Sequence, residues 1–304
     1  MILCAGEALI DMLPRRTEAG EAAFAPYAGG AVFNTAIALG RLGAPTGFLC
    51  GLSSDLFGEK LVEVLNASKV DAALSPRVDR PTTLAFVTLS DDGHAKYAFY
   101  DESTALSALS AEELPDPPPA VEAVFVGGIS LAGSAAPAFE DFAGRSGDRV
   151  LALDPNIRPA FARDEAAYKA RIGRMIGMAD IVKISDEDLL WLEGDGGEDT
   201  ARGLLDRGPR LVCLTRGADG VTGLTPSHRV EVPAVRAEVV DTVGAGDTFN
   251  AGLLAGLSEA GVLTKEGLDA LDEPALRSAL ELGARAASVT VSRAGANPPW
   301  RSEL

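Results

Sequence analysis

The chain has 304 residues, with 27 Lys and Arg against 44 Asp and Glu, which gives a formal net charge of −17. This charge argues against a broad surface for nucleic acid or anionic membranes, because both need a positive patch. With only two His residues the chain cannot build a multi-His metal site, so carboxylates must carry most acid–base chemistry. The composition is that of a folded protein, and the length predicts one large domain, alone or with a small appendage.

The N-terminal sequence, MILCAGEALIDML, predicts neither a signal peptide nor a membrane span. It has no basic start, and Glu7 and Asp11 interrupt its apolar residues. The three cysteines, Cys4, Cys50 and Cys213, lie in apolar, strand-like runs without the spacing of a metal motif. This pattern is typical of buried thiols in a reducing compartment. We therefore expect a cytoplasmic protein.

Apolar runs alternate with helical patterns through most of the chain. In chain order, the apolar runs predict buried strands at residues 2–5, 46–50, 121–127, 149–153, 180–184 and 210–215. Helical patterns lie between and after them, at residues 32–42, 57–66, 134–144, 164–178, 198–207, 246–260 and 274–291. This alternation predicts an α/β fold with a doubly wound, mostly parallel sheet that is covered by helices on both faces.

One segment, residues 82–100, breaks the alternation. It contains two strand-like runs joined by Asp91-Asp92-Gly93, which is a hairpin turn signal. We expect this hairpin to combine with strands from the early part of the chain into a small β-sheet lid, formed discontinuously by about residues 7–30 and 80–103 of a single domain that spans 1–304. An antiparallel edge of the main sheet is the alternative for the hairpin.

The most informative stretch for chemistry is residues 241–250, DTVGAGDTFN, at the start of a strong helix. Gly244, Ala245 and Gly246 let the backbone turn sharply and direct several N–H groups at one point, which makes an anion site together with the helix dipole. Asp247 lies in the same first turn. It either caps the helix or acts as a general base beside an anion hole that stabilises a transferring phosphoryl group.

Two long motifs resemble the signatures of the ribokinase/PfkB family of carbohydrate kinases. Residues 241–257, DTVGAGDTFNAGLLAGL, resemble the C-terminal signature, and residues 29–44, GGAVFNTAIALGRLGA, resemble the N-terminal one. Two signatures in the right order are far more specific than a single Gly-rich loop. The resemblance covers essentially the whole chain, and residues 6–14, 154–159 and 182–189 are most similar to bacterial fructokinases. It implies a doubly wound fold with a small β lid.

The resemblance implies a sugar site near the lid. Asp11 should accept hydrogen bonds from sugar hydroxyls, and Asn34 can both donate to and accept from them. Gly29 and Gly30 should let the sugar approach the backbone. Phe99 on the hairpin should face the sugar.

The resemblance also implies the residues that bind phosphate. Arg158, which follows the strand at 149–153, should neutralise the transferring phosphate. Lys183 should reach the nucleotide. Ser185 stands where the family has the Asn of its phosphate and magnesium motif, and this change puts a direct contact with phosphate in doubt.

The same resemblance implies which residues bind metal ions. Asp188 stands where the family has a Glu, and it should hold Mg²⁺ through water, because Mg²⁺ keeps much of its hydration shell. Asp241 and Val243 resemble the loop that binds a monovalent cation in some relatives, which makes K⁺ a candidate activator.

Residues 215–220, TRGADG, resemble the nucleotide loop of the family. Gly217 and Gly220 should permit a tight turn, and Thr215 should contact the phosphates of ATP. Arg216 stands where most relatives have a small or apolar residue, and it either adds a positive charge over ATP or projects outward. Asn297 should flank adenine and ribose.

Together these features predict an ATP-dependent sugar kinase, with fructose as the first choice of substrate and fructose 6-phosphate as the product. A kinase for 2-keto-3-deoxygluconate is one alternative, because Arg15 and Arg16 could bind its carboxylate. Another sugar or nucleoside kinase and a non-catalytic sugar sensor are further alternatives. A Rossmann oxidoreductase is improbable, because the first strand is not followed by GxGxxG.

The lid also bears on assembly. Pairing two lids would bury their edges and apolar faces, so we expect a homodimer through the lid. Tyr97 on the hairpin either faces the sugar or packs in that contact.

Overall fold

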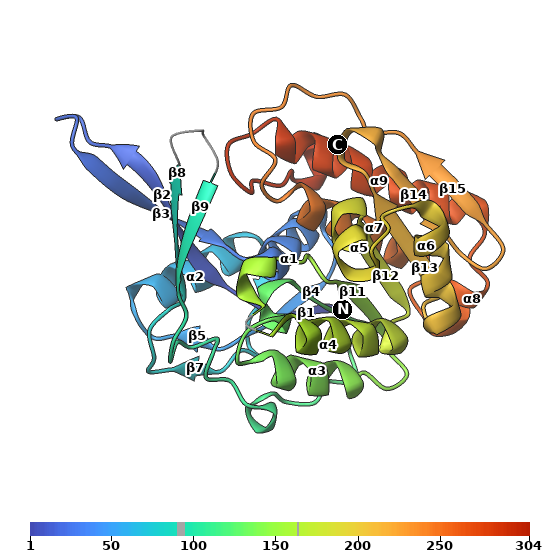
Figure 1. Cartoon of the computed structure of the whole chain (residues 1–304), viewed down its shortest axis with the longest axis horizontal. Helices are drawn as coiled ribbons and strands as arrows, with labels where there is room; N and C mark the ends of the chain where they lie inside the picture. The colour runs from blue at the N-terminus through green and yellow to red at the C-terminus, as the bar shows by residue number, and fades with distance from the viewer. Residues whose placement is uncertain (90–94, 163) are drawn as a thin grey trace.

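The computed structural model describes residues 1–89, 95–162 and 164–304. Within these residues the larger sheet has nine strands in the order β15-β14-β13-β12-β11-β10-β1-β4-β6 (Figure 1). Neighbouring strands are parallel except at the β13–β14 and β14–β15 pairs. The strands are β1 (Ile2–Ala5), β4 (Thr46–Leu49), β6 (Val70–Asp71), β10 (Ala123–Gly127), β11 (Val150–Asp154), β12 (Ile181–Ser185), β13 (Leu211–Thr215), β14 (Val221–Leu224) and β15 (Arg229–Val232).

Helices flank this sheet on both faces (Figure 1). Helix α7 packs against both α1 and α9, and α3 packs against α4. Strands such as β1 and β11 are buried along their whole length, because side chains on both of their faces meet helices. The helices are α1 (Ala31–Leu42), α2 (Leu56–Ala67), α3 (Ala136–Gly144), α4 (Glu165–Met178), α5 (Asp186–Glu193), α6 (Glu198–Gly203), α7 (Ala245–Glu259), α8 (Lys265–Asp269) and α9 (Glu273–Val291).

The predicted doubly wound α/β fold is confirmed. Each strand predicted for the main sheet is present, with ends within one or two residues of the prediction. The helix predicted at 198–207 is shorter, because α6 ends at Gly203 and a 3₁₀ turn follows over Leu204–Arg207. Sequence patterns missed β14 and β15, whose four residues each are too short for a clear periodic signal.

A second, four-stranded sheet stands apart from the main one and projects from the body of the molecule (Figure 1). Its strand order is β3 (Ala22–Gly29), β2 (Leu9–Arg16), β8 (Leu84–Leu89) and β9 (Ala95–Tyr100). The hairpin is therefore not an edge of the main sheet. The predicted turn at Asp91-Asp92-Gly93 lies outside the described residues. All four strands fall within 7–30 and 80–103, and the division of the chain into one domain with this lid stays a prediction. A further pair joins β5 (Leu52–Ser53) to β7 (Arg77–Val78).

The lid sheet has two different faces. Asp11 pairs with Ala85, and Ala85 pairs with Phe99, so these residues share one face. Phe86 pairs with Met12 and lies on the opposite face. Among the described residues, no helix is long and apolar enough to cross a membrane.

Candidate active site

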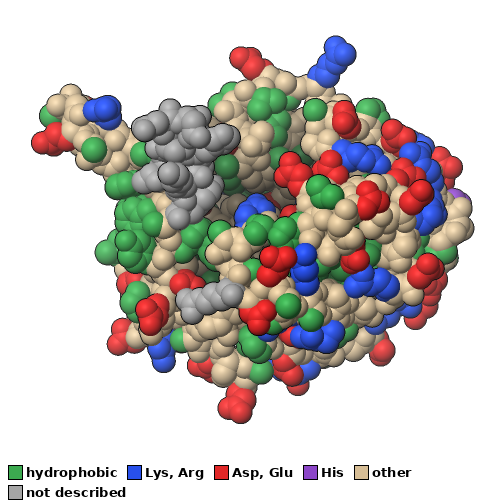
Figure 2. Space-filling view, in the orientation of Figure 1, with side chains coloured by type: hydrophobic (Ala, Val, Ile, Leu, Met, Phe, Trp, Pro, Cys, Tyr) green, Lys and Arg blue, Asp and Glu red, His purple; other side chains and the backbone are tan. Residues whose placement is uncertain are grey.

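A cleft opens between the lid and the carboxyl ends of the main-sheet strands, where ligands bind in open α/β sheets (Figure 2). Its volume is about 1680 Å³, which exceeds the ~300–1,000 Å³ of a pocket for one small ligand and leaves room for two. Most of the predicted site residues line it: Asp11, Gly30, Asn34, Phe99, Arg158, Lys183, Ser185, Asp188, Thr215, Gly217, Val243, Gly244, Gly246 and Asp247.

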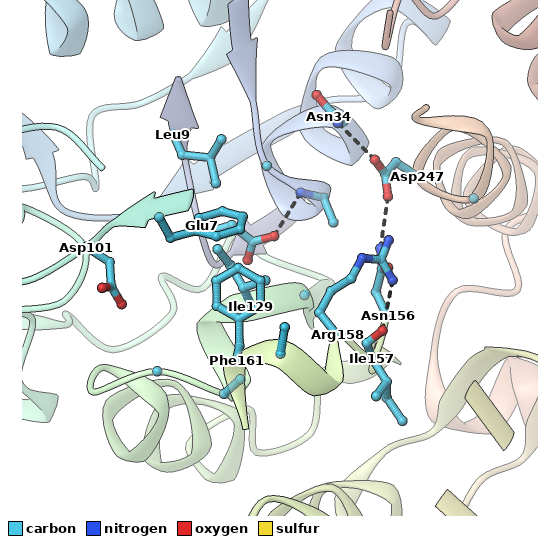
Figure 3. Close-up of a pocket in the computed structure, with 18 of the residues that line it drawn as sticks. Glu7, Leu9, Asn34, Asp101, Ile129, Asn156, Ile157, Arg158, Phe161 and Asp247 are labelled. Atoms are coloured by element: carbon cyan, nitrogen blue, oxygen red, sulfur yellow. Dashed lines mark hydrogen bonds between the residues drawn. The ribbon is translucent and has the colours of Figure 1, made fainter. Parts of the chain in front are cut away.

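Asp247 lies in the first turn of α7 and is 6% exposed. Its Oδ2 accepts a hydrogen bond from Asn34 Nδ2 at 2.9 Å, and its Oδ1 accepts one from Asn156 Nδ2 at 3.4 Å (Figure 3). Helix α7 is capped by Gly244, with a φ of 78°, and no side chain bonds to its first amides. The capping interpretation of Asp247 is therefore wrong, and its carboxylate faces the cleft.

Burial raises the pKa of Asp247 to about 7, with Asp154 adding to the shift, while the Asn34 hydrogen bond and Lys183 oppose it. A carboxylate with a pKa near the working pH is suited to accept a proton from a hydroxyl and to release it afterwards. The same burial would cost folding free energy without any benefit if Asp247 were an acidic residue with no function on the helix.

We expect the pH profile of kcat/KM to report this group. Protonated Asp247 cannot accept a proton, so kcat/KM should fall about tenfold per pH unit below an apparent pKa near 7. Above that pKa the profile should be level until another group titrates. Steady-state rates between pH 5 and 9 test this, and a profile that is flat from pH 5 to 8 would show that Asp247 is not the base.

The glycine turn before Asp247 supplies fewer free amides than predicted. The amide of Ala245 donates to the carbonyl of Thr242 at 3.3 Å, and Ala245 does not line the cleft. Gly244 and Gly246 line it, and neither amide has a backbone partner in the described chain. Of the three predicted amides, only these two at the N-terminus of α7 remain candidates for the anion site.

A buried ion pair lies behind this turn. Lys183 Nζ is 3.1 Å from Asp154 Oδ2, which also accepts a hydrogen bond from Asn250 Nδ2 at 2.7 Å. Burial lowers the pKa of Lys183, but Asp154 and Asp188 outweigh it and raise the pKa overall. A Cβ added at Gly246 would lie 3.2 Å from Lys183 Nζ. The lysine thus places a fixed positive charge beside the anion site.

Residues 154–161, which we call the arch, follow β11 and carry Arg158. Asn156 has a φ of 41°, and its backbone N–H donates to Asp154 Oδ1 at 3.1 Å. Figure 3 shows the guanidinium of Arg158 projecting into the cleft toward Asp247. Arg158 is exposed there, with one N–H donated to the carbonyl of Ile157 at 2.9 Å. Asn156 was not predicted as a site residue, although it stands in the same DPNIRP motif.

Asp188 has the chemistry to help hold Mg²⁺. It lines the cleft at 9% exposure, and burial raises its pKa to about 6. Its Oδ1 accepts the amide of Ile157 at 3.1 Å. Ser185 caps α5 through the amide of Asp188 at 3.0 Å. No group of three or more His, Cys, Asp or Glu side chains that could hold a metal ion occurs among the described residues.

Gly29 has a different role from the predicted one. It does not line the cleft, and a Cβ added there would overlap Asp11 Oδ2. The glycine therefore leaves room for the Asp11 carboxylate rather than for a ligand. Burial raises the pKa of Asp11 to about 6.

Replacing Gly29 with Ala should displace Asp11 and raise the KM for the sugar about 10–100-fold, because a hydrogen bond to a charged group contributes about 1.5–3 kcal/mol. The kcat should change less. Gly203→Ala is the matched control, since a Cβ at this helical position meets no atom within 4 Å. An unchanged KM in Gly29→Ala would show that Asp11 does not hold the sugar.

Glu7 is a cleft residue that sequence reasoning missed. It is 1% exposed, and its Oε1 accepts the amide of Ala31 at 2.8 Å, while its Oε2 accepts the amide of Ser130 at 3.2 Å (Figure 3). Burial raises the pKa of Glu7, and these amides oppose that shift. The carboxylate joins the start of α1 to the 3₁₀ turn Gly128–Leu131. Its position two residues after the end of the first strand was the available signal.

The predicted nucleotide loop is only partly in the cleft. Thr215 and Gly217 line it, but Gly220 does not, and a Cβ there would overlap the carbonyl of Val232. Arg216 donates to Thr222 Oγ1 at 3.0 Å and lies 3.5 Å from Glu198 Oε2, so it is directed away from the cleft. Gly220 is therefore a turn residue, and the outward alternative for Arg216 is confirmed.

Two more predicted residues lie outside the cleft lining. Asn297 Oδ1 accepts a hydrogen bond from Arg41 at 2.8 Å, which holds it against α1. Asp241 accepts the amides of Val243 at 3.0 Å and Gly295 at 2.9 Å. It ties this loop together, while Val243 itself lines the cleft.

Known proteins resemble this chain along its whole length. Residues 1–303 match the pfkB family carbohydrate kinase profile. A fructokinase of Rhizobium leguminosarum bv. trifolii is 52% identical over 91% of this chain and 86% of its own length. A Xylella fastidiosa fructokinase structure with bound ATP is 29% identical, covers 97% of this chain and 93% of its own, and has a TM-score of 0.88. An aminoimidazole riboside kinase of Salmonella enterica is 25% identical, with coverages of 97% and 94% and a TM-score of 0.82.

Proposed function

The chain belongs to the pfkB family of carbohydrate kinases and is an ATP-dependent sugar kinase, and we propose that it converts fructose to fructose 6-phosphate with Asp247 as the general base. The observation that carries the base is the buried Asp247 carboxylate at the N-terminus of α7, with a pKa of about 7. The similarity to the Rhizobium leguminosarum fructokinase supports the choice of sugar.

The proposed reaction follows from this geometry. Asp11 aligns the sugar so that one hydroxyl faces Asp247, which takes its proton as the oxygen attacks the γ-phosphorus of ATP in line. Asn34 and Asn156 fix the carboxylate, because each donates an N–H to one of its oxygens. The amides of Gly244 and Gly246, with Arg158 and Lys183, stabilise the negative charge that builds on the phosphoryl oxygens.

Asp188 fits the ligand chemistry of Mg²⁺, which when bound supplies charge neutralisation at the phosphates. The Asp241 loop is proposed as the place for K⁺, although both oxygens of the Asp241 carboxylate accept hydrogen bonds from backbone amides.

We further propose a cytoplasmic location, which is compatible with three free, buried cysteines.

The charges at the sugar end favour a neutral sugar over an acidic one. Asp11, Asp101 and Glu102 line the cleft, with Arg80 as an opposing charge, and Figure 3 shows Asp101 on the side away from Asp247. Such a surface disfavours a substrate with a carboxylate. Arg15 does not line the cleft and donates to Tyr27 Oη at 3.2 Å, which leaves it no role in binding 2-keto-3-deoxygluconate there.

A panel of sugars in a coupled ADP-release assay tests the proposal. Fructose should give the highest kcat/KM, above ribose, glucose, aminoimidazole riboside and 2-keto-3-deoxygluconate. A preference for 2-keto-3-deoxygluconate would overturn the choice of substrate. Sugar binding without ADP release would favour the sensor.

We also propose a homodimer through the outer face of the lid. Phe24 and Tyr100, which are 43% and 62% exposed, each make an edge-on ring contact with Phe86 on that face. Figure 2 shows hydrophobic side chains gathered on this side of the molecule. Exposed apolar surface of this kind is typical of interfaces.

Light scattering after gel filtration should give about twice the chain mass of 31.4 kDa, and Phe24→Asp should shift it to the monomer. Met178→Asp, at an apolar residue that is 38% exposed on α4, should leave the mass unchanged. A monomeric wild-type protein would refute the dimer. The side chain of Tyr97 lies outside the described residues.

A further inference from the structure

A pair of aromatic rings joins the lid to the arch. Phe99, on the cleft face of β9, lies with its ring centroid 4.1 Å from that of Phe161, at an interplanar angle of 69°. Both side chains line the cleft. Aromatic pairs in edge-on geometry contribute about 0.5–1.5 kcal/mol beyond the area they bury.

Phe161 is coupled to Arg158 by a single rigid turn. The segment Pro159–Phe161 is a 3₁₀ turn in which the amide of Phe161 donates to the carbonyl of Arg158 at 2.9 Å. Pro159 fixes φ at the start of this turn. Holding the Phe161 backbone in place therefore also holds the backbone that carries the guanidinium, which Figure 3 shows on the same loop.

The two halves of the arch are held differently. Its first half is tied to the body, because Asn156 donates to Asp247 and the amide of Ile157 donates to Asp188. Its second half is more open to solvent, since Arg158, Pro159 and Ala160 are all exposed. The contact with Phe99 thus gives the lid a way to fix the second half.

We propose that Phe161 is a positioning residue, which uses its contact with Phe99 to hold Arg158 in place for phosphoryl transfer when the lid lies over the sugar. This inference rests on the proposed kinase function. Phe99 would then do more than face the sugar. Through Phe161 it would connect the lid to Arg158, whose positive charge is proposed to contact the phosphate. Placement errors of about 1 Å can cost up to 10²-fold in rate.

A double-mutant cycle in the full-length protein tests the coupling. Phe99→Leu and Phe161→Leu should each lower kcat with fructose about tenfold, and the double variant should be no slower than either, because both remove one contact. The KM for ATP should stay within about twofold. Phe161→Tyr keeps the ring and should restore kcat. Phe57→Leu, at a partly buried ring outside the cleft, is the matched control.

Hydrogen exchange in the ligand-free protein gives a readout that does not need activity. Phe99→Leu should speed exchange of the amides of Phe161 and Ala162 by about fivefold or more, although residue 99 is in another element. Exchange in β11 should not change. Unchanged exchange at these amides, or effects on kcat that multiply in the double variant, would overturn the inference. If the wild-type protein phosphorylates no sugar, the proposed function fails, and the exchange experiment still decides the coupling.

Discussion

Replacing Asp247 with Asn is expected to lower kcat for sugar phosphorylation by about 10²–10⁴-fold, with little change in sugar affinity. The amide cannot accept the hydroxyl proton, yet it fills the same space and keeps an oxygen for the hydrogen bond from Asn34. Steady-state kinetics with saturating ATP measure this loss. Asp199→Asn, in the first turn of α6 and exposed, should keep full turnover. Full turnover by Asp247→Asn would show that Asp247 is not the general base.

The same substitution should make the protein more stable at pH 8. The pKa of Asp247 is about 7 in the folded chain, against an ordinary value of 3.8, so the folded state binds the proton more tightly. Stability therefore falls as pH rises from about 4 through 7, by on the order of 2–4 kcal/mol for this group. Asn avoids that cost. The Tm should rise more at pH 8 than at pH 4, where the carboxyl is largely protonated in both states, whereas loss of a helix cap would lower the Tm at both.

Replacing Lys183 with Met is expected to cost about 3–5 kcal/mol of stability at pH 7, because it leaves Asp154 charged and buried without its partner. The kcat should fall as well, since the fixed charge beside the anion site is lost. Lys183 also lowers the pKa of Asp247, so the pH profile of the variant should move to higher pH. Denaturant unfolding and pH-dependent kinetics measure these changes.

A double variant separates the two roles of Lys183. Adding Asp154→Asn removes the orphaned charge and should restore most of the stability, while kcat stays low. Lys60→Met is the control, because this half-exposed lysine on α2 has no ion pair with the residues that the structure describes. A kcat that recovers together with stability would show that the lysine is only structural.

The sequence predicts the elements that have strong periodic patterns, and it predicts the motif residues that reach the cleft. It could not predict how those residues use their hydrogen bonds. Asn34 was expected to bind sugar, yet its amide donates to Asp247 from a helix 213 residues away in sequence. Gly29 and Asn297 stand in or near motifs, but packing with Asp11 and Arg41 decides their roles. Such contacts depend on the register of distant elements.

Glu7 and Phe161 were missed for a related reason. A carboxylate just after the first strand is informative only once the start of α1 and the turn after β10 are placed around it. Phe161 belongs to no sequence motif, and its proposed role depends on its contact with the Phe99 ring of the lid sheet. The net charge of −17 likewise gave no hint that Arg158, Lys183 and the amides of Gly244 and Gly246 line one cleft, where we propose that phosphate binds.

The most direct test is to identify the product by ³¹P NMR after incubation of the full-length protein with fructose and MgATP, in parallel with Asp247→Asn. We expect fructose 6-phosphate and ADP from the wild-type protein, and no sugar phosphate from the variant over the same time. No fructose 6-phosphate from the wild-type protein, or an equal yield from the variant, would contradict the proposed reaction.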